Sequence, residues 1–177
     1  TNSEALSAAV AGDWTAAGTI ADEDGDTTGD RDGDLPTIKI AETSTGSGAA
    51  VEGSDAGETS VDPVPGLFTV TLSNESEYAT TVTLSLTAGA ANAAEIADDI
   101  SSLQYWDATA NNDAGGWVDV VNNQVTIGAG ETSIDLRVNP TSDTVYEDIE
   151  NFDINIVNAS TNSEALSAAV AGDWTAA

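Results

Sequence analysis

The sequence predicts an all-β fold, a two-sheet antiparallel sandwich of about seven or more short strands. Apolar residues alternate with Thr, Ser, Asp and Asn over several short stretches, which is the pattern of strands that bury one face. Gly, Pro and Asn separate these stretches, and the hydrophobic fraction of 40% is sufficient for a packed core. Many short strands with turns between them are typical of two packed antiparallel sheets.

The strands are expected in this chain order: residues 13–20, 35–40, 68–72, 82–86, 117–121, 124–127, 134–138 and 152–156. The side chains expected to face the core are Ile38, Ile40, Phe68, Val70, Leu72, Val82, Leu84, Leu86, Ile134, Leu136, Val138, Phe152, Ile154 and Ile156. Asn122 and Asn123 should form the turn of a hairpin between 117–121 and 124–127, because Asn tolerates positive φ.

Residues 88–103 depart from the alternation. This stretch is rich in Ala, and Ile96, Ile100 and Leu103 recur at helical spacing. Such spacing puts apolar side chains on one face of a helix, so a short helix is expected here.

The chain is strongly acidic. Asp and Glu number 31 against 3 Lys and Arg, for a formal net charge of -28. Like charges at this density oppose compaction unless bound cations or high salt neutralise or screen them. The same charge argues against nucleic acid as a partner, because that association needs basic side chains. No apolar stretch is long enough for a membrane helix, so direct membrane insertion is not expected.

Several catalytic chemistries have no residues to support them. The chain has no Cys and no His, so it has no thiol nucleophile and no imidazole base or metal ligand. Phosphate-binding Gly motifs are absent, and carboxylate pairs such as Asp98–Asp99 are too common here to indicate a glycosidase. We therefore expect a protein that is not an enzyme.

A perfect internal repeat organises the chain. The seventeen residues TNSEALSAAVAGDWTAA occur twice, starting at positions 1 and 161. Spacing of one domain length is typical of tandem arrays, so we expect this sequence to be a window onto a longer chain. Neighbouring copies of the same repeat, in a head-to-tail array or filament, are then the expected partners.

The order of the motifs resembles the Calx-β family, the calcium-binding β-sandwich repeats of large bacterial extracellular and surface proteins. The matching segments are PTIKI at 36–40, VEG at 51–53, FTVTLS at 68–73, GAGETSIDLRV at 128–138, DTVYEDIENFDINIVN at 143–158 and GTIADED at 18–24. Residues 88–116 are longer than the corresponding family segment, and their nearest match is 97–100. The resemblance implies an Ig-like sandwich with calcium bound at one end.

The resemblance also implies the calcium ligands. The candidates in the sandwich are Glu52, Asp99 (or its neighbour Asp98), Asp143, Glu147 and Glu150, and those in the acidic tail of the preceding repeat are Asp22, Glu23 and Asp24. The residues support this reading independently, because calcium takes six to eight oxygen ligands, and loop carboxylates supply them. The alternative is that these carboxylates are solvated surface charges.

The segment 22–34 is a second candidate for calcium. Asp alternates with Gly there, and the ligands would be Asp24, Asp26, Asp30, Asp32 and Asp34. Such alternation is typical of Asp-rich calcium loops, although the EF-hand pattern is not met. The alternative is an acidic linker without bound metal.

The family order suggests a domain map. Residues 1–20 would be the last strand of the preceding repeat, 21–34 a calcium-binding linker, and 35–177 a sandwich that is cut short in its last strand. We expect a structural repeat of a secreted, calcium-dependent fibre, adhesin or surface-layer protein outside the cell. A calcium-sensing regulatory module and a glycan-binding module, with Trp106 and Trp117 as a stacking platform, are the alternatives.

Overall fold

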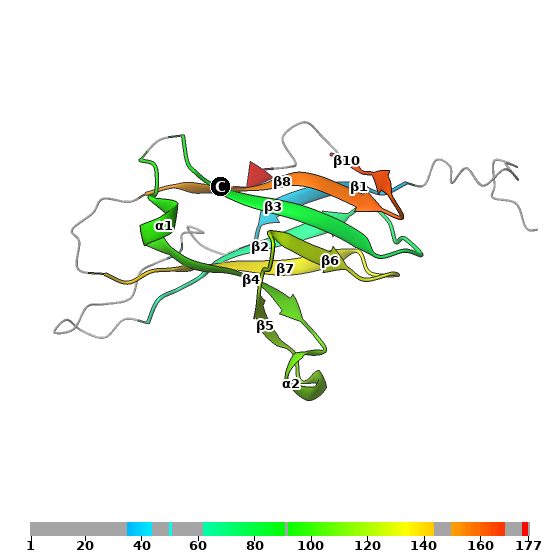
Figure 1. Cartoon of the computed structure of the whole chain (residues 1–177), viewed down its shortest axis with the longest axis horizontal. Coiled ribbons are helices and arrows are strands. Elements are labelled where there is room, and N and C mark those ends of the chain that lie inside the picture. The colour runs from blue at the N-terminus through cyan, green and yellow to red at the C-terminus, as the bar shows by residue number, and fades with distance from the viewer. Residues whose placement is uncertain are drawn as a thin grey trace, which may run out of the picture. The chain divides into compact units, whose positions relative to one another are not determined.

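Two β-sheets pack against each other and form a sandwich (Figure 1). This computed structural model describes residues 35–43, 50, 62–90, 92–143, 150–168 and 175–176. The predictions for 1–34 therefore lie outside the described residues. The larger sheet has six strands in the order β10-β1-β2-β7-β4-β5, and the smaller has β11-β8-β3-β6, with β9 also paired to β8.

The strands are short, as the sequence predicts. Their bounds are β1 Thr37–Glu42, β2 Gly66–Leu72, β3 Thr80–Ala88, β4 Ile100–Asp107, β5 Gly116–Asp119, β6 Gln124–Ile127, β7 Ser133–Pro140, β8 Phe152–Thr161, β9 Glu164–Ala165, β10 Ser167–Ala168 and β11 Thr175–Ala176. Two helices of four residues each, α1 Ile96–Asp99 and α2 Ala110–Asp113, complete the described elements. The prediction of an all-β sandwich is confirmed.

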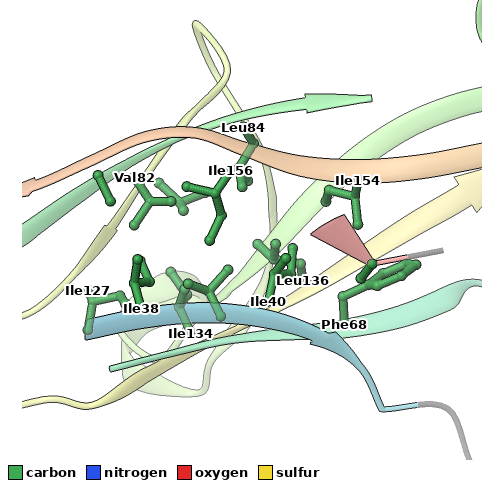
Figure 2. Packing of buried hydrophobic residues seen from close by; sticks show 14 of the residues in the cluster. Ile38, Ile40, Phe68, Val82, Leu84, Ile127, Ile134, Leu136, Ile154 and Ile156 are labelled. Atoms are coloured by element: carbon green, nitrogen blue, oxygen red, sulfur yellow. The ribbon is translucent and has the colours of Figure 1, made fainter. Parts of the chain in front are cut away.

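The core lies between the two sheets and comes from the alternating stretches. Side chains of β3 and β8, including Val82 and Ile154, point toward those of β1, β2 and β7, including Ile40 and Leu136 (Figure 2). Successive side chains of a strand point to opposite faces, so each alternating stretch delivers its apolar half to this layer. At one end of the core the rings of Phe68 and Phe152 meet edge to face, with centroids 6.0 Å apart.

Part of the segment 88–103 differs from the predicted helix. Of its described residues, only Ile96–Asp99 are helical, and the chain continues directly as β4 from Ile100. Ile100 and Leu103, which share helical spacing with Ile96, instead pack against the core from this strand. Pairing of β4 with β7 and β5 satisfies its backbone and overrides the local spacing.

The turn at Asn122 and Asn123 is confirmed, but the paired hairpin is not. Both residues have positive φ, 55° and 59°. The flanking strands nevertheless belong to different sheets, because β5 pairs with β4 whereas β6 pairs with β3. Only an isolated bridge joins Val121 and Gln124. The turn thus carries the chain from one sheet to the other.

The second copy of the repeated segment is part of the sandwich. Within it, β9 and β11 pair with β8, and β10 pairs in parallel with β1. Leu166 and Ala176 are buried in the core. The last strand of the segment is described over Thr175–Ala176, and residues 169–174 lie outside the described residues.

Truncation of Leu136 should be much more destabilising than truncation of Leu67. Leu136 is 0% exposed on β7, whereas Leu67 on the neighbouring β2 is 37% exposed. Leu136→Ala leaves a cavity and should lower the free energy of unfolding by about 2–5 kcal/mol. Leu67→Ala should change it by about 0.5 kcal/mol or less, as is usual at the surface. Urea unfolding of both variants measures the difference, and equal losses would contradict the packing described above.

Candidate metal centre

Helix α1 lies at one end of the sandwich (Figure 1). Residues of α1 and its neighbours line an open pocket of about 720 Å³. Four carboxylates contribute to its wall, together with the hydroxyl-bearing residues Ser101 and Thr141. These carboxylates belong to Glu95, Asp98, Asp143 and Glu150. They come from three segments of the chain: the start of α1, the stretch after β7 and the residues before β8.

Hydrogen bonds hold the first two of these segments together. The N–H of Thr141 donates to the carbonyl oxygen of Asp99 at 2.8 Å. The hydroxyl of Ser101 donates to the carbonyl oxygens of Asn139 and Pro140, each at 3.1 Å. Asp143 follows two residues after Thr141, so the end of β7 carries its carboxylate to the side of α1.

The backbone of Asn151 fixes the third segment. Its N–H donates to the carbonyl oxygen of Asn92 at 2.6 Å, and its carbonyl oxygen accepts from Gly89 at 2.8 Å and Ala94 at 3.0 Å. A Cβ at position 89 would approach this carbonyl oxygen to 2.8 Å, so only Gly fits there. These bonds place the adjacent Glu150 beside the start of α1.

Asp99 and Asp98 have different surroundings. The Asp99 carboxylate accepts a hydrogen bond from the backbone N–H of Glu95 and thereby closes the turn of α1. The pocket wall includes Asp98, which the family resemblance left as the alternative, and does not include Asp99. Of the predicted ligands, the structure thus brings Asp143 and Glu150 together with Asp98.

Glu95 is a wall residue that the sequence reasoning missed. It precedes α1 and stands three residues before Asp98, a spacing that puts two side chains on the same face of a helical turn. This spacing was the available signal, but the Ala-rich segment around it contains no family motif.

The remaining predicted ligands lie outside the described residues. They are Glu52, Glu147, Asp22, Glu23, Asp24, Asp26, Asp30, Asp32 and Asp34. Within the part of the chain that the structure describes, no group of three or more acidic side chains converges closely enough to hold a metal ion. The four described carboxylates therefore line a wide pocket and do not form a closed coordination shell.

The pocket wall combines oxygen donors with partial burial. Asp143 and Glu150 are half-buried, and one carboxylate oxygen of Glu150, Oε2, is inaccessible to solvent. Glu95 and Asp98 are exposed at the rim. Carboxylates and hydroxyls are the hard oxygen donors that calcium prefers, whereas zinc and copper favour nitrogen and sulfur ligands. The chemistry of these donors, though not their spacing in the described residues, suits a hard divalent cation.

Glu131 differs from the pocket carboxylates, because its carboxylate accepts a hydrogen bond within a turn. Its Oε2 accepts a hydrogen bond from the N–H of Gly128 at 3.1 Å, and its own N–H donates to the Gly128 carbonyl oxygen at 3.0 Å. Glu131 precedes β7 and Asp143 follows it. The eight residues of this strand separate the two carboxylates by about 25 Å.

The two candidate stacking residues pack on each other. Trp106 and Trp117 face each other across β4 and β5, with ring centroids 5.6 Å apart in an edge-to-face arrangement. The guanidinium of Arg137 lies 4.7 Å from the centroid of Trp117. Trp106 is 42% exposed. Since Arg137 already covers the ring of Trp117, this pair fits surface packing better than a two-ring sugar platform.

A hydrogen-bonded carboxylate begins the turn after β4. The side chain of Thr109 donates to Asp107 Oδ1 at 2.7 Å and its backbone N–H donates to the same oxygen at 2.8 Å. These bonds favour the charged form and hold the pKa of Asp107 below its ordinary value. Burial instead lowers the pKa of Arg137, because it disfavours the charged guanidinium.

Comparison with known proteins finds no family model and no curated protein that matches this chain. Among the described residues, none of the helices is long and apolar enough to cross a membrane.

Removal of the Thr109 hydroxyl should raise the pKa of Asp107. The side-chain hydrogen bond is the largest cause of the depressed pKa, so Thr109→Ala should move the titration midpoint toward the ordinary value. A depressed pKa contributes stability above the unfolded-state pKa, and this contribution is lost as the pH falls through the folded-state pKa. NMR titration of the carboxyl carbon measures the midpoint, and an unchanged midpoint would contradict the assignment.

Proposed function

We propose that this chain is a structural repeat of a secreted, calcium-dependent fibre, adhesin or surface-layer protein. The observation that carries the proposal is the pocket at the end of the sandwich. It draws the carboxylates of Glu95, Asp98, Asp143 and Glu150 from three chain segments to one wall. On this proposal, a bound calcium ion links these segments and stiffens the end of the domain.

Electrostatics support a cation at this place. The chain carries a net charge of -28, so each carboxylate in the pocket adds to a repulsion that already acts across the molecule. A divalent cation between neighbouring carboxylates attracts each of them and so offsets their mutual repulsion. The three basic residues of the chain are too few to neutralise its carboxylates. Calcium accepts a flexible set of six to eight oxygens, which suits ligands on loops.

The tandem repeat supports a mechanical role. The same seventeen residues begin at positions 1 and 161, and the second copy contributes β9, β10 and β11 to the sandwich. Copies joined at this spacing would form a linear array whose reach grows with each repeat. The resemblance to Calx-β repeats of surface proteins supports the same Ig-like type, the extracellular location and the head-to-tail contact between copies.

Calcium should raise the melting temperature. A ligand that binds only the folded state stabilises it by about 2.7 kcal/mol at a hundredfold excess over its Kd. We expect this gain to appear as a higher melting midpoint in calcium than in a chelator, at matched ionic strength. Differential scanning calorimetry in magnesium or sodium salts of equal ionic strength is the control for screening. An identical midpoint in all conditions would contradict the calcium proposal.

Glu150→Gln and Glu131→Gln should differ in their effect on calcium affinity. Both substitutions remove one negative charge and keep the side-chain shape, but only Glu150 lies at the pocket. Loss of a residue that merely orients a metal ligand costs about 10–100-fold in affinity, so loss of a direct ligand should cost at least as much. Glu131→Gln should leave the affinity nearly unchanged.

Isothermal titration calorimetry of both variants measures these affinities, and Asp143→Asn provides a second variant at the pocket. Small and equal losses for all three would indicate diffuse counter-ion binding, which would contradict a defined site.

A further inference from the structure

The second copy of the repeated segment occupies an edge of the sandwich that is made by β1 and β8. Ser167 and Ala168 of β10 lie opposite Thr37 and Ile38 in a parallel pair. Ile38 is completely buried, so the short β10 closes the larger sheet directly beside the core.

Leu166 anchors the segment between the two sheets. It is 4% exposed within the core cluster, and its N–H donates to the carbonyl oxygen of Ala159 at 2.8 Å. The preceding residues form β9, in which Ala165 lies opposite Ser160 of β8. A single leucine thus fills a core position while the backbone on either side pairs with two different sheets.

The end of the segment pairs farther along β8. Thr175 and Ala176 lie opposite Asn155 and Ile154, and the Thr175 hydroxyl donates to Asn155 Oδ1 at 2.8 Å. Ala176 is 7% exposed. The segment therefore contacts the sandwich near both ends of β8.

We infer that this edge is a docking site for residues 4–17 of another copy of this chain, which exchange with residues 164–177. Residues 1–17 and 161–177 are identical, so every side chain that contacts the edge from the second copy is also present in the first. In the exchanged arrangement Leu6 takes the place of Leu166. Ser7 then pairs with Thr37, and Thr15 pairs with Asn155, both of the accepting copy.

The turn that leads into the segment favours this exchange. Asn162 and Ser163 connect β8 to β9 and both have positive φ, 42° and 72°. Left-handed backbone is unfavourable for a residue with a Cβ, and Ser lacks the tolerance that Gly has. A short strained connection promotes strand exchange between copies, because an incoming strand makes the same pairings without that turn.

Charge favours a second copy over the chain's own edge as the acceptor. Seven carboxylates lie between residues 22 and 34, and these residues connect the first copy of the segment to its own sandwich. A connection with this charge repels itself and favours extension. The inference rests on the head-to-tail contact of the proposed function but not on calcium.

Cysteine cross-linking between two chains tests the register. The natural sequence has no Cys, so each introduced thiol is unique. A Ser7→Cys chain is mixed with an isotope-labelled Thr37→Cys chain and oxidised, and mass spectrometry should find the mixed heterodimer as the main product. Paired positions have the Cα separation that a disulfide needs. The control partner is a labelled Thr126→Cys chain, whose cysteine lies exposed on β6 in the other sheet.

Two leucines in identical sequence surroundings provide matched variants. Leu6→Asp in the Ser7→Cys chain should lower the heterodimer yield by about tenfold or more, because a carboxylate replaces the side chain that enters the core. Leu166→Asp in the Thr37→Cys chain should raise the yield, because it weakens the competing segment of the acceptor. If Leu166→Asp prevents the Thr37→Cys chain from folding, the Leu6→Asp variant of the Ser7→Cys chain still tests the inference by itself.

Equal heterodimer yields with Thr37→Cys and Thr126→Cys, or an unchanged yield with Leu6→Asp, would overturn the inference. The oxidation is performed both in calcium and in excess chelator. Heterodimer in both conditions supports strand exchange whatever the melting experiment gives. Calcium-dependent melting without heterodimer would overturn the exchange alone and leave the proposed calcium role standing.

Discussion

The pairing of β3 with β8 is the interaction on which both ends of the sandwich depend. It runs from Ala88 opposite Phe152 to Thr80 opposite Thr161, with one irregularity after Thr83. At one end of this ladder, β8 is preceded by Glu150, which lines the pocket, and by Asn151, whose backbone hydrogen bonds hold that segment in place. At its other end β8 ends with the first residue of the repeated segment. One antiparallel ladder thus positions the candidate metal centre and the proposed docking edge.

The distribution of charge follows from the same arrangement. Among the described residues, the fully buried side chains are apolar except for Thr80 and Thr161, so the described carboxylates lie on outer faces and in the segments between strands. Acidic side chains at outward positions of a strand are kept apart, because residues on the same face are two positions, or about 7 Å, apart along the strand. At the ends of the sandwich, chain segments converge and no such spacing applies. The pocket beside α1 is where this convergence brings four carboxylates to one wall.

The observed role of the repeated segment, closing its own sandwich, and its proposed role in joining copies have a common physical origin. Its described strands are only two residues long, and they pair with β1 and β8, while Leu166 and Ala176 are buried in the core. An edge that presents unpaired N–H and C=O groups accepts any strand with a matching sequence. If the chain is one repeat of a tandem array, each copy contains such a strand, and on the proposed exchange the same edge that closes one domain would join two.

The amino-acid sequence by itself determined many of the residues that enter the core, although Ile127 and Leu166 were not among those expected there. Period-two alternation is a property of neighbouring residues, so Phe68, Val70 and Leu136 could be assigned to the buried face before any partner strand was known. The Asn122-Asn123 turn was equally local, because positive φ depends on the residue type.

Only the tertiary structure decided how these elements combine. Local spacing could not show that β5 and β6 join different sheets, or that Ile100 lies in a strand. The pocket gathers Asp98, Asp143 and Glu150 from separate segments of the chain. Asp99 does not line it, and its carboxylate instead accepts a hydrogen bond from the backbone N–H of Glu95. Sheet register and long-range hydrogen bonds determine these relationships, and both depend on residues that are tens of positions apart in the chain.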